Sequence, residues 1–367
     1  MKVGISTFHF VHNNGAMLQC WALQEKLNEM GHETIVINYR PKYHVRQYSA
    51  WRNPLFVKGF KNKLKTFILN YRYFERKKKE LKFIEFEKNF ILSDEVNDYT
   101  EWGKIHPETM DAIICGSDQI WNEKLTNGKF DSAYFAQIDG FSGKKIAYAV
   151  SVGETKLQDR KEELFELIKD FKAISTRERH TEEELKDLFP FLSITTVPDP
   201  TLLLEKSKYE KIMVDIVLPH DYILVYSLEN NDQLMELCKS LVFSTGLEII
   251  NISPTRIVGI PNIIWKADVT PGEFITYISK ASYVVTNSFH GSVFSLLFNK
   301  KVAIVPHSKR NDRLANLVEV LDAGCCMLDN SNMHEVLEFN IDYNKINERI
   351  IHYKSIGELF INEALLE

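Results

Sequence analysis

A histidine lies at the junction between a strand-like and a helix-like segment in the second half of the chain. Residues 283–297 read YVVTNSFHGSVFSLL, so His290 follows an apolar, β-branched run and opens an apolar helical one. Unpaired N–H groups at a helix N-terminus bind anions, and histidine exchanges protons near neutral pH. We therefore predict that His290 is catalytic and that Ser288, Gly291 and Ser292 hold an anionic ligand, with Gly291 letting it approach the backbone. The alternative is a histidine that only packs in the core.

A second polar group follows an apolar run in the first half of the chain. Residues 113–121 read IICGSDQIW, which predicts a buried strand that ends near Gly116. Asp118 is of a type that can orient or deprotonate a hydroxyl. Gln119 and Trp121 would add an amide and an aromatic platform for the same ligand. The alternative role for Asp118 is to cap the next helix or turn.

The loop after the first strand-like segment also carries polar side chains. It contains His9 and His12, and Asn13 and Asn14 precede a helix-like segment that begins near Ala16. Amide side chains and free N–H groups at a strand end suit hydroxyl-rich or anionic ligands. A plain turn in which an asparagine caps the helix fits the same pattern.

An arginine follows another strand-like segment in residues 173–179, which read AISTRER. Guanidinium groups grip carboxylates and phosphates bidentately, so we predict that Arg177 binds an anionic ligand. A surface ion pair of Glu178 with Arg177 or Arg179 is the alternative explanation. Further positive charge is available downstream of His290 at Lys300, Lys301, Lys309, Arg310 and Arg313.

Parallel β-α-β units are the elements that would position these residues. Short β-branched runs alternate with helical patterns, as is typical of parallel sheets. The expected strands are Val3–Ser6, Thr34–Asn38, Ala112–Cys115, Lys145–Val150, Ala173–Ser175, Thr195–Val197, Tyr222–Tyr226, Glu248–Ile252, Ile263–Trp265, Tyr283–Thr286 and Val302–Val305.

The pattern predicts an α/β protein with two facing Rossmann-like domains and a central cleft. We expect an N-terminal domain over 1–200, a C-terminal domain over 201–343, and a helix over 344–367 that packs back on the first domain. Ligands bind at the carboxyl ends of the strands in such folds. We therefore expect all the residues above to face that edge.

One segment of the first domain breaks the alternation. A basic helical insertion is expected over 52–90, and residues 58–82 hold ten Lys or Arg, only two acids and several aromatic residues. Such a segment is either a solvated helical hairpin or a peripheral contact with an anionic membrane surface.

Composition and missing motifs exclude several classes of protein. The net charge of −5 argues against a nucleic-acid partner. The sequence has no G-x-G, no P-loop, no D-x-D, no H-E-x-x-H and no metal spacing among its five cysteines. We therefore expect no metal and no cofactor. Because the chain opens directly on a strand pattern with no signal peptide, we expect a cytoplasmic protein, with some of it at the inner membrane face.

Five segments in order resemble the polysaccharide pyruvyl transferase family. They are NNGAMLQCWALQ, GSDQIWN, STRERHT, VPDPTLLL and NSFHGSVFSLLFNKKVAIV, which together span most of the chain. The resemblance implies a GT-B-like fold, phosphoenolpyruvate as donor substrate, and transfer of pyruvate as a ketal to a saccharide acceptor, lipid-linked or free, in surface-polysaccharide synthesis. It places Arg177 and His290 at the donor. We assign Asn13, Asn14, Gln119 and Trp121 to the acceptor side. Several members of the family carry Arg two residues before this histidine, where this chain has Ser288.

Two other functions stay open on the same fold. One is a metal-independent GT-B glycosyltransferase that uses a nucleotide sugar, since the same helix N-terminus could hold its phosphates. The other is a glycan-binding protein without catalysis. The products separate the three functions. A pyruvyl transferase releases inorganic phosphate, a glycosyltransferase releases a nucleotide, and a glycan-binding protein binds the saccharide without turnover.

Overall fold

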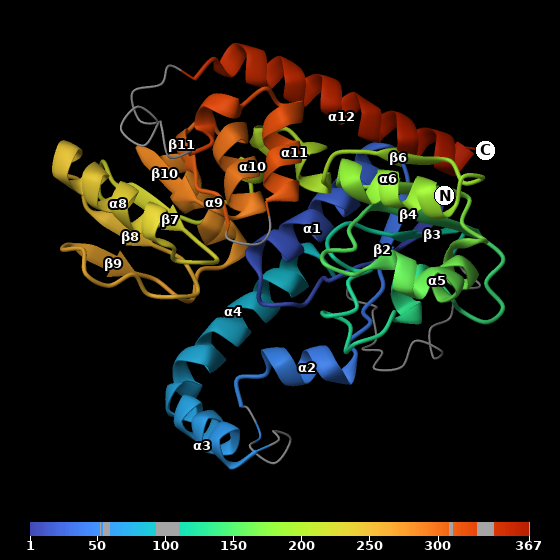
Figure 1. Ribbon diagram of the computed structural model, residues 1–367, viewed down its shortest axis with the longest axis horizontal. Coiled ribbons are helices and arrows are strands. Elements are labelled where there is room, and N and C mark those ends of the chain that lie inside the picture. The colour runs from blue at the N-terminus through green and yellow to red at the C-terminus, as the bar shows by residue number, and fades with distance from the viewer. Residues whose placement is uncertain (52, 54–58, 93–109, 308–310, 329–340, 367) are drawn as a thin grey trace. The chain divides into compact units, whose positions relative to one another are not determined.

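The computed structural model describes residues 1–51, 53, 59–92, 110–307, 311–328 and 341–366. The chain divides into two compact units. Unit 1 contains Met1–Pro200 together with Leu359–Glu367, and unit 2 contains Thr201–Glu358. Each unit has one parallel sheet (Figure 1).

Unit 1 is built on a six-stranded sheet in the order β2-β1-β3-β4-β5-β6, in which all neighbours are parallel. Its strands are β1 (Lys2–Ser6), β2 (Glu33–Val36), β3 (Ala112–Cys115), β4 (Lys144–Val150), β5 (Ala173–Thr176) and β6 (Ile194–Thr196). Its helices are α1 (Asn14–Glu29), α2 (Lys42–Tyr48), α3 (Phe60–Leu69), α4 (Tyr73–Phe90), α5 (Lys161–Ile168) and α6 (Arg179–Leu188), with 3-10 turns at Asn70–Arg72, Ser132–Phe135 and Leu157–Arg160.

Unit 2 is built on a five-stranded parallel sheet in the order β11-β10-β7-β8-β9. Its strands are β7 (Ile223–Tyr226), β8 (Ile249–Asn251), β9 (Ile263–Trp265), β10 (Tyr283–Thr286) and β11 (Lys301–Ile304). Its helices are α7 (Lys206–Glu210), α8 (Asp232–Thr245), α9 (Pro271–Lys280), α10 (Phe289–Leu297) and α11 (Asp312–Val320), with a 3-10 turn at Gly324–Cys326. A further 3-10 turn, Pro200–Leu202, lies at the division between the units.

Apolar strands explain why both sheets form. The central strands β3 (AIIC) and β7 (ILVY) are buried at every position, as expected for parallel strands that are covered on both faces. Helix starts are also encoded locally. The start of α9 has a capping box between Thr270 and Glu273 and a proline in its first turn.

The last helix, α12 (Tyr343–Leu366), contributes its final residues to unit 1. There Lys144 Nζ donates to the carbonyl oxygen of Leu365 at 2.6 Å, and the rings of Tyr148 and Phe360 lie 6.0 Å apart. Among the helices of the described residues, none has the length and apolarity needed to cross a bilayer.

The predicted α/β class and the parallel arrangement of strands are confirmed. Each of the eleven expected strands is present, with ends that differ by at most two residues from those expected. The basic insertion is helical from Phe60 to Phe90, whereas residues 52 and 54–58 at its start lie outside the described residues.

Candidate functional site

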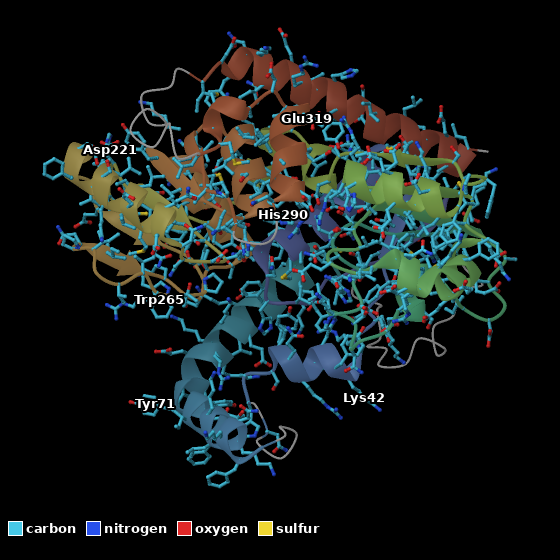
Figure 2. All side chains as sticks on the ribbon, in the orientation of Figure 1. Lys42, Tyr71, Asp221, Trp265, His290 and Glu319 are labelled. Carbon is cyan, nitrogen blue, oxygen red and sulfur yellow. The ribbon has the colours of Figure 1, made fainter. Side chains whose placement is uncertain are left out.

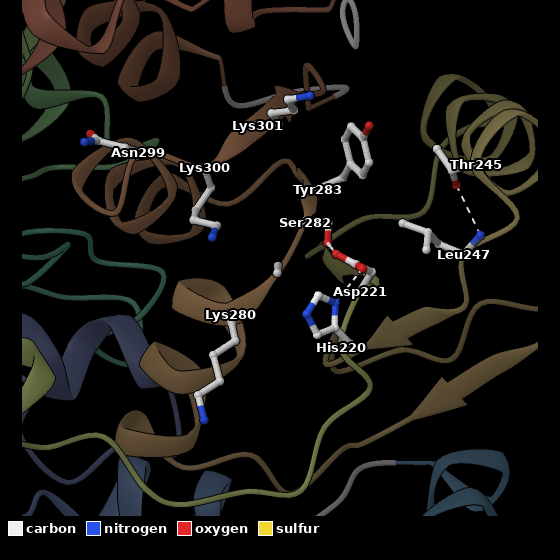
Figure 3. A pocket seen from close by; sticks show the side chains of 11 residues that line it. His220, Asp221, Thr245, Leu247, Lys280, Ser282, Tyr283, Asn299, Lys300 and Lys301 are labelled. Atoms are coloured by element: carbon white, nitrogen blue, oxygen red, sulfur yellow. Dashed lines mark hydrogen bonds and ion pairs between the residues drawn. The ribbon is translucent and has the colours of Figure 1, made fainter.

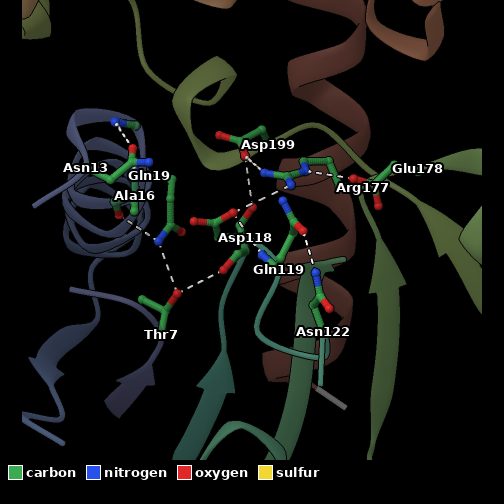
Figure 4. A network of polar contacts seen from close by, with 12 residues as sticks. Thr7, Asn13, Ala16, Gln19, Asp118, Gln119, Asn122, Arg177, Glu178 and Asp199 are labelled. Carbon is green, nitrogen blue, oxygen red and sulfur yellow. Dashed lines mark hydrogen bonds and ion pairs between the residues drawn. The ribbon is translucent and has the colours of Figure 1, made fainter. Parts of the chain in front are cut away.

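Polar side chains gather at the carboxyl-end edge of the unit 1 sheet. Thr7 follows β1, Ser117 and Asp118 follow β3, Arg177 follows β5, and Asp199 follows β6 (Figure 4). Because all six strands are parallel, their carboxyl ends meet at one edge, where open α/β sheets bind ligands. The predicted convergence of these loops is present in the structure.

Arg177 lies among three carboxylates at this edge. Its Nη1 donates to Asp199 Oδ2 at 2.9 Å, its Nε donates to Glu178 Oε1 at 3.2 Å, and its Nη2 lies 3.8 Å from Asp118 Oδ1. The side chain is 2% exposed. Although burial alone would lower it, the three acids raise the pKa of Arg177 above its usual range. The sequence predicted an anion-binding arginine, but the guanidinium in this structure is held by acids of the chain itself.

Asp118 is the acid of this group that reaches solvent. Its side chain is 16% exposed, against 7% for Glu178 and 0% for Asp199. Its backbone has φ 75, a left-handed conformation that Asp and Asn adopt more readily than most residues. Strained positions of this kind concentrate at functional sites because the surrounding structure must hold them in place.

Two features of β4 hold Asp118 in that conformation. The carbonyl oxygen of Asp118 accepts the N–H of Ser151 at 3.1 Å and forms a bridge with the strand end at Val150. The register of β4 shifts between Ala147 and Val150 relative to β5, and Ser175 Oγ accepts the N–H of Ala149 within this bulge. Bulges next to active sites re-aim the chain, and this one brings Ser151 to Asp118.

Gln119 and Trp121 occupy different environments. Gln119 is 9% exposed, and its Oε1 accepts from Asn122 Nδ2 at 2.7 Å (Figure 4). Trp121 is fully buried, stacks on Phe135 with ring centroids 4.8 Å apart, and donates Nε1–H to the carbonyl oxygen of Tyr134. The predicted aromatic platform at Trp121 is therefore wrong, because neither face of its ring reaches the surface.

The two asparagines before α1 have separate roles. Asn13 caps the helix, since its Oδ1 accepts from Gly15 N at 3.0 Å and from Ala16 N at 3.3 Å. The capping alternative is thus confirmed for that oxygen. Asn14 is 7% exposed, and its Oδ1 accepts no hydrogen bond from any described residue. An acceptor contact at either side chain stays a prediction.

Three histidines near this edge, two buried and one half-buried, have lowered pKa values. Burial lowers the pKa of His9, which is fully enclosed and lies 3.0 Å from Asn38 Oδ1. Burial, reinforced by the charge of Lys79, lowers the pKa of His12 to about 4. Burial also lowers the pKa of His44 to about 4. His9 packs inside the unit and does not reach a ligand from the surface.

His290 lies at the carboxyl-end edge of the unit 2 sheet, in the first turn of α10 (Figure 2). Ser288 caps this helix, and its Oγ accepts from Gly291 N at 3.4 Å. The His290 side chain is 8% exposed and its ring lies edge-on to Phe289. The strand end, the cap and the histidine are therefore arranged as predicted, at a helix N-terminus that favours an anion.

Gly291 and the Ser292 side chain contribute to the packing of α10. A Cβ at Gly291 would overlap Thr286 Oγ1 and would lie 3.1 Å from the ring of Tyr226, so the glycine is needed for close approach of the helix to the sheet. Its role in ligand approach stays a prediction. Ser292 is fully buried, and its hydroxyl donates to the carbonyl oxygen of Ser288 at 3.0 Å. The predicted donor contact of the Ser292 side chain is therefore wrong.

An open hollow of about 710 Å³ lies elsewhere in unit 2 (Figure 3). It is lined by the amino ends of β7, β10 and β11, including Tyr283, Lys300 and Lys301. His290 follows the opposite end of β10, so these two lysines do not supplement the charge at the α10 N-terminus. Lys309 and Arg310, proposed for the same purpose, lie outside the described residues.

The sequence profile of the family described as polysaccharide pyruvyl transferase matches residues 13–309, which is most of the chain. The matched range contains the edge residues of unit 1 from Asn13 onward, including Asp118 and Arg177, and the N-terminus of α10 with His290. The chain belongs to the polysaccharide pyruvyl transferase family. The resemblance inferred from the five sequence segments is thereby confirmed. No curated protein matches the chain.

Solved structures of low sequence identity share the fold. UDP-N-acetylglucosamine 2-epimerase from Rickettsia bellii has a TM-score of 0.53 and 13% identity, over 99% of this chain and 97% of that chain. The S. aureus MnaA–UDP co-structure has a TM-score of 0.50 and 10% identity, over 95% of this chain and 90% of that chain. This likeness shows that the chain has a GT-B-like α/β fold, as predicted.

In unit 1, sequence reasoning missed the residues that hold the edge together. Asp199 is fully buried and accepts from both Arg177 and Ser117, the latter at 2.9 Å. Thr7 donates to the carbonyl oxygen of Ser117 and accepts from Gln19. The signal for Asp199 was present, since VPDP directly follows the last strand of the unit.

In unit 2, the sequence analysis missed a polar contact beside the α10 loop. His307 Nδ1 lies 3.0 Å from Glu229 Oε2, and Asn287 Nδ2 donates to the carbonyl oxygen of Glu229 at 2.7 Å. His307 follows β11 just as His290 follows β10, so strand-end position could have found it. Within the described residues, no three His, Cys, Asp or Glu side chains are grouped closely enough to hold a metal ion.

Proposed function

We propose that the protein transfers pyruvate from phosphoenolpyruvate to a saccharide as a cyclic ketal during polysaccharide synthesis, without a metal or cofactor. The observation that carries the proposal is a family match over residues 13–309 that includes a capped helix N-terminus with His290 in its first turn. The positions of the side chains in each unit suggest which of them would bind the donor, bind the acceptor and transfer protons.

The donor is assigned to the α10 N-terminus. Phosphoenolpyruvate carries a carboxylate and a phosphate, and N–H groups with the positive end of a helix dipole favour such anions. Ser288 stands where an arginine is expected in the family. Its Oγ caps the helix by accepting from Gly291 N, an acceptor role that a guanidinium cannot take. In this chain the backbone of α10 therefore carries more of the anion binding.

The saccharide acceptor is assigned to the unit 1 edge. Three carboxylates around one guanidinium leave that group of side chains net negative, which disfavours a second anion and suits a neutral polyol. Carboxylate oxygens accept hydrogen bonds from hydroxyls. Asp118, which reaches solvent, is the candidate base, and Arg177 is a positioning residue that orients it.

The reaction balances with these two groups. His290 protonates the methylene carbon of phosphoenolpyruvate, which makes the adjacent carbon electrophilic. A sugar hydroxyl forms a C–O bond to that carbon while Asp118 takes its proton. The C–O bond to phosphate then breaks, a second hydroxyl closes the ketal, and its proton leaves with the phosphate or a base. Inorganic phosphate is the only other product, and no oxidant is needed.

The test is incubation of the purified protein with phosphoenolpyruvate and a panel of free and lipid-linked saccharides. We expect phosphate release only with a suitable acceptor. Mass spectrometry should then show a product whose mass is that of the acceptor plus pyruvic acid minus one water. Activity is expected to be the same with and without a chelator. Nucleotide release from a nucleotide sugar would indicate a glycosyltransferase instead. Acceptor binding without turnover of either donor would indicate a glycan-binding protein.

A further inference from the structure

An apolar stripe is exposed on α3 and the turn that follows it. The exposed fractions are 81% for Phe60, 51% for Leu64, 67% for Phe67, 62% for Ile68 and 91% for Tyr71. Tyr71 projects away from the ribbon into open space (Figure 2). Exposed apolar residues that occur singly need no explanation, but a contiguous set of this kind marks an interaction surface.

The spacing of these residues places them on one face. Positions 60, 64, 67, 68 and 71 follow the i, i+4, i+7, i+8, i+11 pattern of one helical stripe. Lysines flank the stripe on both sides, with Lys61 and Lys65 on one side and Lys63 on the other, and all three are exposed. The buried residue Thr66 lies on the remaining face, turned toward the protein.

The charge of this region has one sign. Residues 34–74 contain nine Lys or Arg and no Asp or Glu, and acids resume only at Glu75. A long acid-free stretch in a chain with a net charge of −5 attracts an anionic surface and repels cationic ones.

The helix that follows α3 is firmly attached to unit 1. Glu87 in α4 is 2% exposed and accepts both contacts at 2.8 Å from Arg40 Nη2. Gln24 in α1 donates to the carbonyl oxygen of Ile91, just after α4, at 3.1 Å. One end of the insertion is therefore built into the unit, while the α3 end presents the apolar stripe to solvent.

We propose that α3 with Tyr71 is a membrane-docking surface whose partner is an anionic lipid bilayer. The apolar stripe enters the boundary between headgroups and acyl chains, and the flanking lysines extend to the lipid phosphates. This occupant is favoured because aromatic and aliphatic side chains lie between two rows of lysines, as in interfacial helices. A nucleic acid would pair with the lysines but would leave the aliphatic part of the stripe in water. The proposal does not depend on the proposed function.

The test is co-sedimentation of the full chain with vesicles of phosphatidylcholine mixed with phosphatidylglycerol, and with vesicles of phosphatidylcholine alone. We expect binding to the anionic vesicles that weakens as salt is raised, and much weaker binding to the neutral ones. Equal binding to both kinds of vesicle, or no binding to either, would overturn the proposal.

Two paired variants separate the apolar and the charged contributions. Phe67→Ser with Tyr71→Ser should weaken binding about tenfold or more, because each apolar side chain buried in the bilayer contributes strongly. Phe243→Ser removes an equally exposed aromatic from α8, at 94% exposure, and should change nothing. If the Phe67 and Tyr71 variant binds like the unchanged protein, α3 is only an electrostatic patch and insertion is excluded.

For charge, Lys61→Gln with Lys65→Gln should weaken binding about 25-fold, at about fivefold per lysine. Lys206→Gln with Lys211→Gln removes the same net charge from exposed positions in unit 2 that neighbour Glu205 and Glu210, and should have little effect. Equal losses in both variants would show that net charge alone governs the contact and would overturn a specific α3 surface. Thermal unfolding of every variant checks that the fold is intact.

Discussion

The carboxyl-end edges of the two sheets have the same topology and opposite chemistry. The unit 1 edge has three acids around Arg177, most of it buried, and its one solvent-reaching acid is Asp118. The unit 2 edge has a capped helix N-terminus, hydroxyls and His290, and its described acid, Glu229, is paired with His307. Parallel sheets thus supply a place for ligands, and the residues after each strand decide which ligands fit.

The difference also separates two ways of holding charge. In unit 1, charge is balanced between side chains, so loss of one partner leaves others buried and unpaired. In unit 2, positive potential comes from the backbone of α10, which survives a change of side chain. Substitutions should therefore damage activity in unit 2 with little loss of stability, whereas loss of a buried charged partner in unit 1, Arg177 or Asp199, should damage stability as well as activity.

The largest effect is expected for His290→Ala. Loss of a general acid typically lowers turnover by about 10²–10⁴-fold. The helix N-terminus remains, so binding of phosphoenolpyruvate should change much less than turnover. Phosphate release and donor affinity, measured on the same preparation, test this expectation.

Because His290 is buried, its alanine variant also needs a control for folding. His290→Gln and His290→Asn keep a polar side chain near the same size and should be inactive while unfolding near the temperature of the unchanged protein. Turnover within a few-fold of the unchanged protein in any of the three would make His290 a structural residue.

The next effect is expected for Asp118→Asn, which should lower turnover by about 10²-fold or more if Asp118 is the base. Asn tolerates the left-handed backbone of this position, so stability should hold. Asp118→Ala removes the same carboxylate but adds backbone strain, and should lose stability too. If Asp118→Asn is fully active, another group is the base.

The strand-end positions of these residues followed from the sequence, whereas their partners did not. Alternating apolar runs placed Asp118, Arg177 and His290 after strands, and each lies there. Trp121 was misjudged because an apolar pattern does not tell which side of a strand-end loop faces the core. The packing role of Gly291 could not be predicted, because the close approach of α10 to Thr286 is a tertiary contact with no local signal.

Arg177→Met tests the charge balance of unit 1. Breaking a buried ion pair costs about 3–5 kcal/mol, because Asp199, with 0% exposure, then loses its cation. The unpaired acid would bind a proton in the folded state more readily than in the unfolded state. The deficit in the free energy of unfolding of this variant, relative to the unchanged protein, should therefore shrink as pH falls from about 7 to about 5.

The free energy of unfolding of Arg177→Lys should lie between that of Arg177→Met and that of the unchanged protein, because one ammonium group cannot reach all three acids. It should also shift the pH profile of turnover, because Arg177 orients Asp118. A Met variant as stable as the unchanged protein at neutral pH would show that the acids are already protonated or solvated.

The smallest effect concerns the acid sensitivity of unit 1 and is tested with His44→Gln. Burial lowers the pKa of His44 to about 4, below the usual 6.5, so the unfolded state binds the proton first as pH falls. The neutral ring therefore stabilises the fold above pH 6.5, and this contribution is lost between about pH 6.5 and 4. At about pH 5 the loss amounts to about 2 kcal/mol.

Glutamine should remove that loss and keep one hydrogen bond, because His44 Nε2 donates to the carbonyl oxygen of Leu125 at 2.9 Å and a side-chain amide can do the same. Urea unfolding at about pH 7 and about pH 5 should show a smaller pH dependence in the variant by about 2 kcal/mol. His220→Gln is the matched control in unit 2. His220 is exposed, and Asp221 raises its pKa, so its contribution to stability grows as pH falls, with the opposite sign to that of His44. Its loss should therefore not reduce the pH dependence. If the free energy of unfolding changes equally with pH in His44→Gln and in the unchanged protein, His44 is protonated in the folded state at the lower pH. The two units would then not differ in their response to acid.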